Sequence, residues 1–246
     1  MAKALSYGAD VVIVDLEDAV APERKEYART ATAEFLAAAH PVPVHVRIAD
    51  SQDLPSLVGL PGLSGLRLPK VTHASDIHRV ASRAPDLALY ALLESALAVE
   101  HAHVIASAHP SVRGIALGEA DLRADLGVRH DTGLDWSRGR VVVAARAAGL
   151  APPAQSVFPD VRDLDGLAAS CVRGRALGLL GRAAIHPRQL PVIERAFLPT
   201  PREIGEAEEI LEAAARDAGA HALSDGRFVD AAIVAAARRT LSLADR

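Results

Sequence analysis

The sequence has one cysteine, one tryptophan and few aromatic residues, and each shortage excludes a class of structure or function. Cys171 alone can form no intrachain disulfide and supplies no cysteine-rich zinc site, so a reducing cytoplasm is the expected compartment. Nucleic acids attract basic patches and stack on aromatic rings, but this chain has a net charge of -4 and 3% aromatic residues. We therefore expect no nucleic-acid partner.

Long apolar segments and nucleotide-binding loops are also absent from the sequence. No apolar run approaches the roughly 20 residues that cross a bilayer, and residues 1–5 do not lead into a signal peptide. Gly59, Gly62 and Gly65 have the wrong spacing for a phosphate loop or a dinucleotide fingerprint. These absences argue against a membrane partner and against nucleotide-dependent chemistry, whereas a small anionic or thioester substrate needs only a local basic site.

Short apolar runs alternate with helical stretches along most of the chain. The runs expected to form strands are 10–14, 42–46, 66–68, 87–93, 114–117, 156–158 and 183–185, and residues 26–39, 74–82 and 164–179 have helical spacing. Regular alternation of this kind predicts parallel strands joined by right-handed crossovers. Both a doubly wound sheet and a closed barrel satisfy the pattern.

The number of units favours a TIM-type (β/α)8 barrel whose first βα unit is missing. A closed barrel needs eight strands and the pattern supplies about seven. Since residues 2–7 form a short predicted helix that leads into the first strand, the absent unit would precede it. After Pro187 only helices are expected, at 203–219 and 229–243. We predict a barrel over residues 1–197 and a helical arm of the same domain over 198–246.

Ionisable side chains follow nearly every predicted strand. The carboxyl ends of parallel barrel strands converge on one mouth, from which catalytic residues come. The residues at these ends are Asp15, Glu17, Asp18, Arg47, Lys70, Glu94, Glu119, Asp121 and His186. Each acid alone has the alternative interpretation of a helix N-cap or a solvated loop charge, but the set predicts a site. Crowded carboxylates repel one another unless a cation lies among them, and a hard ion such as Mg²⁺ suits oxygen ligands.

Two competing chemistries fit the sequence less well. His101 and His103 are near neighbours, but positions i and i+2 do not share a helix face, which disfavours a histidine-ligated zinc site. No serine lies in a nucleophile-elbow context, so the sequence contains no recognisable Ser-His-Asp arrangement.

A set of short motifs occurs in a fixed order along nearly the whole chain. They are Lys3-Ala4-Leu5, Gly8-Ala9-Asp10, residues 14–22, Val46-Arg47-Ile48, residues 68–71, residues 93–96, residues 116–122 with 125–127, Ala144-Ala145-Arg146 before Gly149-Leu150, and Ile185-His186-Pro187 with Gln189. Together they resemble the citrate lyase β-subunit and malyl-CoA lyase group of the HpcH/HpaI aldolase superfamily. The resemblance implies a barrel enzyme that uses Mg²⁺.

The resemblance also implies a role for each matched residue. Glu94 and Asp121 match the two carboxylates that hold Mg²⁺, and Arg47 matches the arginine that binds the keto-acid or thioester oxygen. Glu17 and Asp18 occupy the acidic motif of the first strand, where they would support the metal site or handle protons. The related pyruvate aldolases have a histidine at the position of Asp18, which argues against that branch.

A further match lies in the predicted arm. Residues 225–230 resemble the stretch whose last aspartate reaches into a neighbouring subunit's site as an acid/base, which would be Asp230 here. That role requires an oligomer, for which a homotrimer or hexamer is expected. Ala232 stands where the family usually has proline, and the alternative for Asp230 is a solvated helix N-cap.

The predicted function is a magnesium-dependent carbon–carbon lyase. Its substrate would be a β-hydroxyacyl thioester of the malyl-, citramalyl- or citryl-CoA type, presented by CoA or by an acyl-carrier protein, and the products would be an acyl thioester and an α-keto acid. Run backwards, the same groups would perform a condensation. The alternative is a non-catalytic, truncated paralogue that acts as a structural subunit, because the family's first strand, with its Arg-Ser and Phe-Val-Pro-Gly stretches, is missing.

Overall fold

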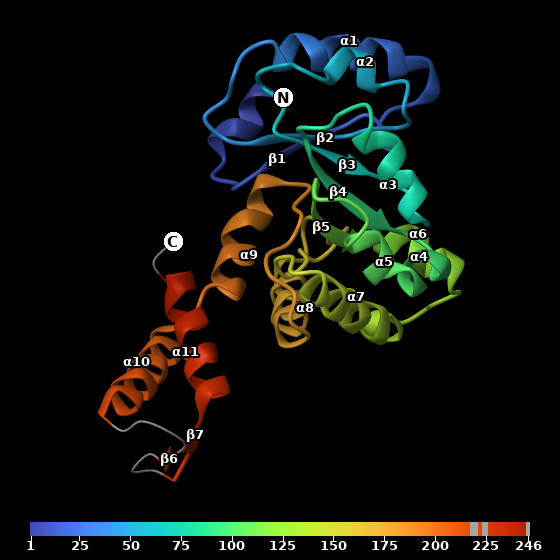
Figure 1. Ribbon diagram of the computed structural model, residues 1–246. Coiled ribbons are helices and arrows are strands. Elements are labelled where there is room, and N and C mark those ends of the chain that lie inside the picture. Colours follow the sequence, from blue (N-terminus) through green and yellow to red (C-terminus); the bar gives the residue numbers. More distant parts are fainter. Residues whose placement is uncertain (217–220, 223–225, 245–246) are drawn as a thin grey trace. The chain divides into compact units, whose positions relative to one another are not determined.

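The computed structural model describes residues 1–216, 221–222 and 226–244, and the chain divides into two compact units, 1–193 and 194–246. The first unit contains a five-stranded sheet, coloured blue to green in Figure 1. Its strands are β1 (Val12–Asp15), β2 (Val44–Arg47), β3 (Gly65–Leu68), β4 (Ala88–Leu93) and β5 (Val112–Leu117). All neighbouring strands are parallel and follow the order of the sequence, which confirms the predicted parallel α/β architecture.

Helices precede, connect and follow the five strands, and parallel pairing requires the crossover connections between consecutive strands. They are η1 (Ala2–Ser6), η2 (Pro22–Arg24), α1 (Lys25–Leu36), α2 (Leu54–Leu57), α3 (Ala74–Ala81), α4 (Ala96–Glu100), α5 (Ala102–Ala106), α6 (Glu119–Asp125), η3 (Asp131–Leu134), α7 (Asp135–Ala147), α8 (Leu164–Ala176), η4 (Pro187–Gln189) and α9 (Leu190–Phe197). Side-chain caps fix several helix starts, for example Asp163, which accepts a hydrogen bond from the Gly166 amide at the start of α8.

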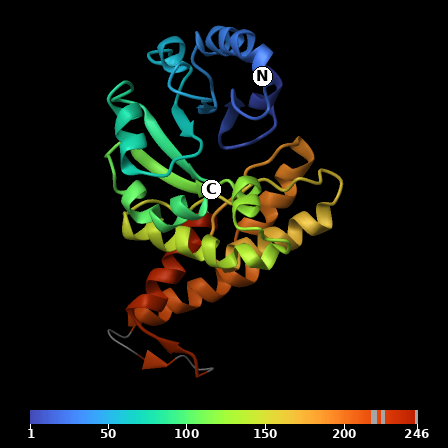
Figure 2. The same cartoon turned by 90° about the vertical axis from the view of Figure 1, so that its right-hand side faces the viewer.

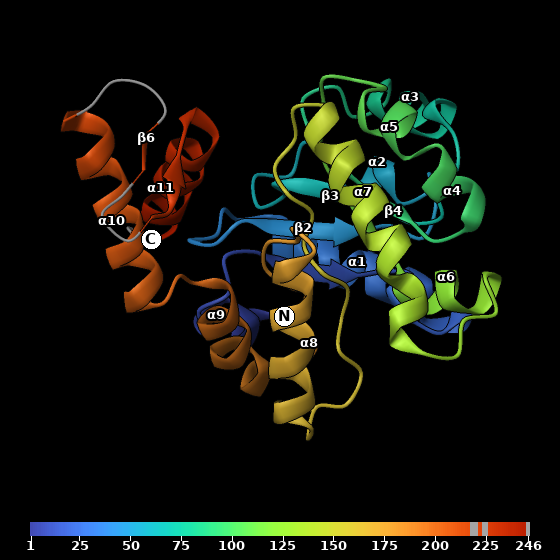
Figure 3. The ribbon, with the colours of Figure 1, turned by 90° about the horizontal axis from the view of Figure 1, so that it is seen from below.

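The two faces of the sheet differ in chemistry because side chains alternate along each strand. One face presents buried Val14, Val46, Leu66 and Ala91 and packs against the apolar sides of the helices. Figures 1 and 3 show α3, α5 and α7 on this side. The opposite face is polar: the register places Asp15 beside Arg47, Arg47 beside Arg67, Arg67 beside Tyr90 and Tyr90 beside Gly114. The polar face therefore leads to the ionisable residues at the carboxyl ends.

The last two predicted strands, 156–158 and 183–185, are replaced by one isolated parallel bridge between Gln155 and Arg182. Three backbone hydrogen bonds still join this pair of segments, from Leu180 to Pro153, Gln155 to Gly181 and Ala183 to Gln155. Beyond the bridge, side chains bond the backbone groups that a longer ladder would pair: Arg182 Nε donates to the Ser156 carbonyl and Gln189 Nε2 donates to the Phe158 carbonyl. Gln189 Oε1 also accepts a hydrogen bond from the Ile185 amide.

β1 is an edge strand of the five-stranded sheet. A hollow of about 670 Å³ runs along it, and its lining includes Val12, Ile13, Val20, Tyr27 and Ala28. Ile13 is 39% exposed although it lies in the middle of the strand. The outer side of β1 is therefore open to solvent, at the position where the sequence pattern lacks a unit.

The second unit is helical, as predicted for the end of the chain. It consists of α10 (Pro201–Arg216), the short strands β6 (His221–Ala222) and β7 (Phe228–Val229), and α11 (Ala231–Ala244). Figure 2 shows α10 and α11 side by side, and β6 pairs antiparallel with β7. The predicted helix at 203–219 starts two residues earlier, and residues 217–219 lie outside the described residues, as does residue 225 of the matched stretch. The helix expected to start at 229 begins at Ala231 because Val229 belongs to β7.

A search of the described helices for one long and apolar enough to cross a membrane finds none.

Candidate active site

The ionisable residues predicted at the mouth follow the carboxyl ends of the strands in the first unit. Asp15 and Arg47 are the last residues of β1 and β2, and they are paired in register. Glu94 directly follows β4, and Asp121 lies in the first turn of α6, just after β5. The fold therefore gathers these residues at the same end of the sheet, as the strand pattern predicted.

Asp15 and Arg47 form a bidentate ion pair. Arg47 Nε donates to Asp15 Oδ1 at 2.8 Å, and Nη2 donates to Oδ2. The carboxylate also accepts hydrogen bonds from the backbone amides of Glu17 and Ala19. Burial raises the pKa of Asp15, but these hydrogen bonds outweigh it and lower the pKa below its usual value. Asp15 therefore stays ionised and fixes the direction of the Arg47 guanidinium.

Glu17 is the most enclosed carboxylate of the β1 loop, with 6% of its surface exposed. Its Oε1 lies 2.7 Å from Lys70 Nζ, and its Oε2 lies 2.8 Å from Arg47 Nη1. The contact to Arg47 lacks hydrogen-bond geometry, so Oε2 is a buried oxygen without a directed donor. Asp18 is 56% exposed at its side chain and lies farther away, 3.7 Å from Arg47 and 3.8 Å from Lys70.

Lys25 holds this loop in place, a role that the sequence reasoning missed. Lys25, in the first turn of α1, donates from Nζ to the backbone carbonyls of Leu16 and Glu17. Two charge-assisted hydrogen bonds to one loop fix the backbone that carries the acidic motif. The signal in the sequence is weak, because a lysine at the start of a predicted helix ordinarily faces solvent.

Lys70 joins the β3 end of the site to two carboxylates. Its backbone amide donates to Glu94 Oε2 at 3.2 Å, while its side chain reaches Glu17. Lys70 is the one residue other than glycine with a positive φ among the described residues, at 54°. This left-handed conformation is unfavourable for a residue with a Cβ, and here it accompanies the amide contact to Glu94.

Glu94 is a buried carboxylate that lies close to other negative charges. It is 5% exposed, and burial together with the negative charges of Glu17 and Asp121 raises its pKa to about 7. Gly118 makes room for it, because a Cβ at this position would lie 2.5 Å from Glu94 Oε1. The site therefore holds a buried carboxylate beside other negative charge, an arrangement that a cation would stabilise.

The donor set fits a magnesium ion with open coordination positions. Mg²⁺ usually binds one or two protein carboxylates and fills its remaining positions with water and substrate oxygens. Glu94 and Asp121 are the carboxylates that would supply such a pair, and the negative charge of Glu17 lies close to Glu94. The described ranges contain no group of three or more His, Cys, Asp or Glu side chains that could hold a metal ion.

A second charged cluster supports the β5 end of the site and was also missed by the sequence reasoning. Arg138 on α7 is 1% exposed and forms a fork with Glu119, the first residue of α6, at 2.8 and 2.7 Å. It also donates to Asp131 and Asp135. One signal was available in the sequence: Arg138 falls on the same helix face as the apolar residues 134, 141 and 145. Arg138 thereby anchors the helix that carries Asp121.

The remaining predicted residues have other surroundings. His186 accepts a hydrogen bond from the Arg188 amide at 3.1 Å as the N-cap of η4. His101 lies between α4 and α5, and its Nδ1 is 2.8 Å from the Thr72 carbonyl oxygen. Asp230 accepts from the amides of residues 232 and 233, each at 2.9 Å, as the N-cap of α11 in the second unit. Its predicted acid/base role remains a prediction.

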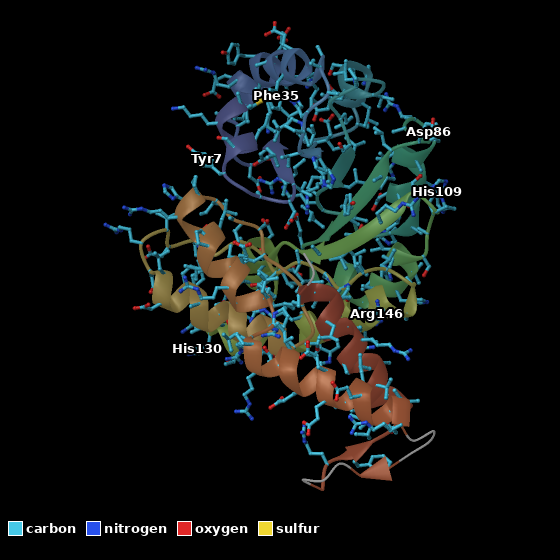
Figure 4. All side chains as sticks on the ribbon, turned by 90° about the vertical axis from the view of Figure 1, so that its left-hand side faces the viewer. Tyr7, Phe35, Asp86, His109, His130 and Arg146 are labelled. Atoms are coloured by element: carbon cyan, nitrogen blue, oxygen red, sulfur yellow. The ribbon has the colours of Figure 1, made fainter. Side chains whose placement is uncertain are left out.

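The amino end of β4 differs from its carboxyl end. Figure 4 labels Asp86 and His109, which precede β4 and β5, and Ser111 Oγ donates a hydrogen bond to the Pro85 carbonyl there. Asp86 is exposed and precedes β4, whereas the buried Glu94 follows it. The contrast between the two ends of β4 agrees with a site at the carboxyl end.

Comparisons with known proteins agree with this geometry. Residues 1–187 match the family described as HpcH/HpaI aldolase/citrate lyase. The chain is 35% identical to (3S)-malyl-CoA thioesterase of Cereibacter sphaeroides, over 99% of this chain and 89% of that protein. It is 30% identical to L-malyl-CoA/beta-methylmalyl-CoA lyase of Rhodobacter capsulatus, over 92% and 84%.

A solved structure extends the similarity to three dimensions. The protein CitE from Mycobacterium tuberculosis, in complex with magnesium, acetoacetate and coenzyme A, has a TM-score of 0.85 and 30% identity, covering all of this chain and 93% of that one. A citrate lyase beta subunit from the same organism, complexed with oxaloacetate and magnesium, has a TM-score of 0.68 and 31% identity, covering 80% and 91%.

Proposed function

Because the chain belongs to the HpcH/HpaI aldolase/citrate lyase family, we propose that it is a magnesium-dependent carbon–carbon lyase. The substrate would be a β-hydroxyacyl thioester of the malyl-, citramalyl- or citryl-CoA type. The products would be an acyl thioester and an α-keto acid. The observation that carries this proposal is the pair Glu94 and Asp121, where burial and neighbouring negative charge raise the pKa of Glu94 to about 7.

The reaction requires movement of one proton and one electron pair. The substrate hydroxyl loses its proton to a base, the oxygen electrons form the keto carbonyl, and the carbon–carbon bond breaks. The electrons of that bond pass to the acyl thioester as an enolate, which then takes a proton at carbon. A magnesium ion bound at this site would supply a Lewis acid for the keto-acid oxygens.

The protein's own groups would hold the substrate and exchange the proton. Arg47, fixed by Asp15, would donate hydrogen bonds to the developing carbonyl oxygen. Glu17 and Asp18, which adjoin Arg47 and Lys70, would exchange the proton. Asp230 is the alternative acid/base, supplied from a neighbouring subunit of a homotrimer or hexamer.

A thioesterase is the second candidate, because a relative with 35% identity bears that name. Hydrolysis would break the thioester bond instead of the carbon–carbon bond, with water as the co-reactant. The two reactions release different products: a lyase yields keto acid and keeps the thioester, whereas a thioesterase yields free thiol and keeps the hydroxy acid.

The test follows keto acid and free thiol together for malyl-, citramalyl- and citryl-CoA, with Mg²⁺ and with EDTA. We expect keto-acid release that requires Mg²⁺ and that falls at least about a hundredfold in Glu94→Gln and Asp121→Asn. Asp86→Asn, at the other end of β4, is the matched control and should keep full activity. Thiol without keto acid would identify the thioesterase, and a folded protein that turns over no substrate would favour the structural paralogue.

A further inference from the structure

Three side chains on the polar face of the sheet form a cluster that the proposed reaction does not use. His45 on β2, Arg67 on β3 and Tyr90 on β4 come from adjacent strands, and Arg67 is paired in register with Tyr90. The His45 and Tyr90 rings stack with centroids 4.6 Å apart, and Arg67 Cζ lies 5.4 Å from the centre of the Tyr90 ring. Tyr90 therefore contacts both of the other groups.

Two glycines make room for this cluster. A Cβ at Gly65 would lie 3.1 Å from the ring of His45, and a Cβ at Gly114 would lie 2.9 Å from Tyr90. Both glycines lie on the same face as the rings, since Gly65 pairs with His45 and Gly114 with Tyr90. Larger residues at these positions would displace the rings from the sheet.

The positive charge of Arg67 is not neutralised. Within the part of the chain that the structure describes, its guanidinium forms no ion pair or hydrogen bond, and its Nε is fully buried. Burial lowers the pKa of Arg67 from its usual value, but arginine stays protonated in proteins. By contrast Arg47, its partner in register on β2, is neutralised by Asp15 and Glu17. Burying an unpaired charge is costly unless a counter-ion binds.

His45 supplies a second unsatisfied donor site. It is 4% exposed, and its Nδ1 has no hydrogen-bond partner. Burial, with a smaller effect of the Arg67 charge, lowers the pKa of His45 to about 4, so the ring is neutral at pH 7. A neutral imidazole can donate one hydrogen bond without adding charge. The cluster therefore carries one positive charge and unused donors, which complements a single anionic group.

We propose that Arg67, His45 and Tyr90 form a binding site for a carboxylate or a carboxylate-sized anion on the polar face of the sheet. Arginine binds such groups through its fork of N–H donors, while the Tyr90 ring holds the guanidinium plane. The carboxylate has two possible sources. One is the far carboxylate of the acid substrate, which rests on the proposed function and would make Arg67 a specificity-determining residue. The other is a free small anion.

The first experiment measures thermal unfolding of the whole chain after metal has been stripped and the chelator removed. Formate, acetate, malonate and chloride are titrated at constant ionic strength held with a bulky sulfonate. For the wild type we expect saturable binding of the anion, which raises the Tm by about 3 to 6 °C for each tenfold increase in anion above its dissociation constant. Because no metal is present and no turnover occurs, a failed lyase assay would not affect this result.

Arg67→Met is the decisive variant, since it keeps length and removes the charge. We expect it to lose the saturable shift and to have a higher Tm than the wild type without anion. Arg113→Met, an exposed arginine on β5, is the control for general loss of positive charge and should respond as the wild type does. A wild type that no anion stabilises overturns the proposal even if Arg67→Met fails to fold, and so does an Arg67→Met variant that keeps the shift.

The second experiment separates the two sources of the carboxylate. With Mg²⁺ present, binding of oxaloacetate and of pyruvate is measured by calorimetry in the wild type and in Arg67→Met. If the substrate occupies the site, oxaloacetate, which has the extra carboxylate, should lose at least tenfold more affinity than pyruvate, or about 1.4 kcal/mol. Equal losses for both acids, with the saturable wild-type shift retained, identify the free anion as the occupant.

Discussion

Two charged clusters lie at the carboxyl end of the same sheet and have opposite electrostatics. Around Arg138 every carboxylate meets a guanidinium, and the hydrogen bonds from Arg138 lower the pKa of Asp131 to about 2. Glu94 is buried and subject to the negative charges of Glu17 and Asp121, and its pKa rises to about 7. The first cluster is already neutralised and can serve structure, whereas the second retains negative charge that a bound cation would use.

The largest expected loss of stability comes from removing Arg138 from its cluster of carboxylates. Arg138→Met leaves Glu119 buried without its partner, which should cost about 3 to 5 kcal/mol of unfolding free energy at pH 7. Urea denaturation measures the loss, and Arg146→Met, at an exposed position on α7, is the control (Figure 4). A loss below about 1 kcal/mol would mean that the cluster does not stabilise the fold.

Glu94→Gln should increase the free energy of unfolding, whereas Arg138→Met should decrease it. The pKa of Glu94 in the folded state lies above its unfolded value of 4.5. The stability that the protonated carboxyl contributes to the fold is therefore fully present below pH 4.5 and is lost as pH rises through about 7. Without metal the glutamine variant should therefore be more stable than the wild type by about 3 kcal/mol at pH 8, and by little at pH 4.5. Urea denaturation at both pH values tests this.

The controls for that prediction are a surface variant and the metal. Glu34→Gln, at an exposed position on α1, should leave the stability at pH 8 unchanged. Adding Mg²⁺ at pH 8 should stabilise the wild type but not Glu94→Gln, since the metal replaces the proton on this carboxylate. Equal responses of the two proteins to Mg²⁺ would remove Glu94 from the proposed ligand set.

Asp131→Asn should have a smaller effect than Arg138→Met, because the Asp131 side chain is 47% exposed and solvent screens its ion pairs. The folded pKa of about 2 lies below the unfolded value of 3.8, so the stabilisation is present above pH 4 and is lost as pH falls towards 2. At pH 7 we expect the free energy of unfolding of Asp131→Asn to be about 1 kcal/mol below that of the wild type. This difference should become smaller between pH 4 and pH 2, as measured by chemical denaturation. A deficit that does not change with pH would contradict the assigned charge effect.

The smallest expected effect on stability comes from the backbone conformation of Lys70, whose amide donates to Glu94. Lys70→Gly and Lys70→Ala both lose the ammonium contact to Glu17, but glycine adopts the positive φ at this position without a Cβ penalty. Lys70→Gly should therefore be more stable than Lys70→Ala by about 1 kcal/mol or less. If alanine is as stable as glycine, the conformation of Lys70 stores no strain.

Much of the framework was accessible from the pattern of residues. Alternating apolar runs predicted β1 to β5, and the strand-end rule predicted that Glu17, Arg47 and Glu94 lie at one end of the sheet. The predicted strands at 156–158 and 183–185 were wrong, because the side chains of Arg182 and Gln189 bond the backbone there, which hydropathy does not show. The site roles of Glu94, Asp121 and Asp230 came from the resemblance and remain predictions.

The sequence by itself determined that the strands run parallel and at which end the charges gather, since both follow from periodicity and from the geometry of βα units. Only the tertiary structure decided how those charges are balanced. Arg47 and Arg67 are paired in register on neighbouring strands, but Arg47 meets two carboxylates and Arg67 meets the ring of Tyr90. Such pairings join residues on different strands, and electrostatic energies depend on distance and burial, which the order of residues does not specify.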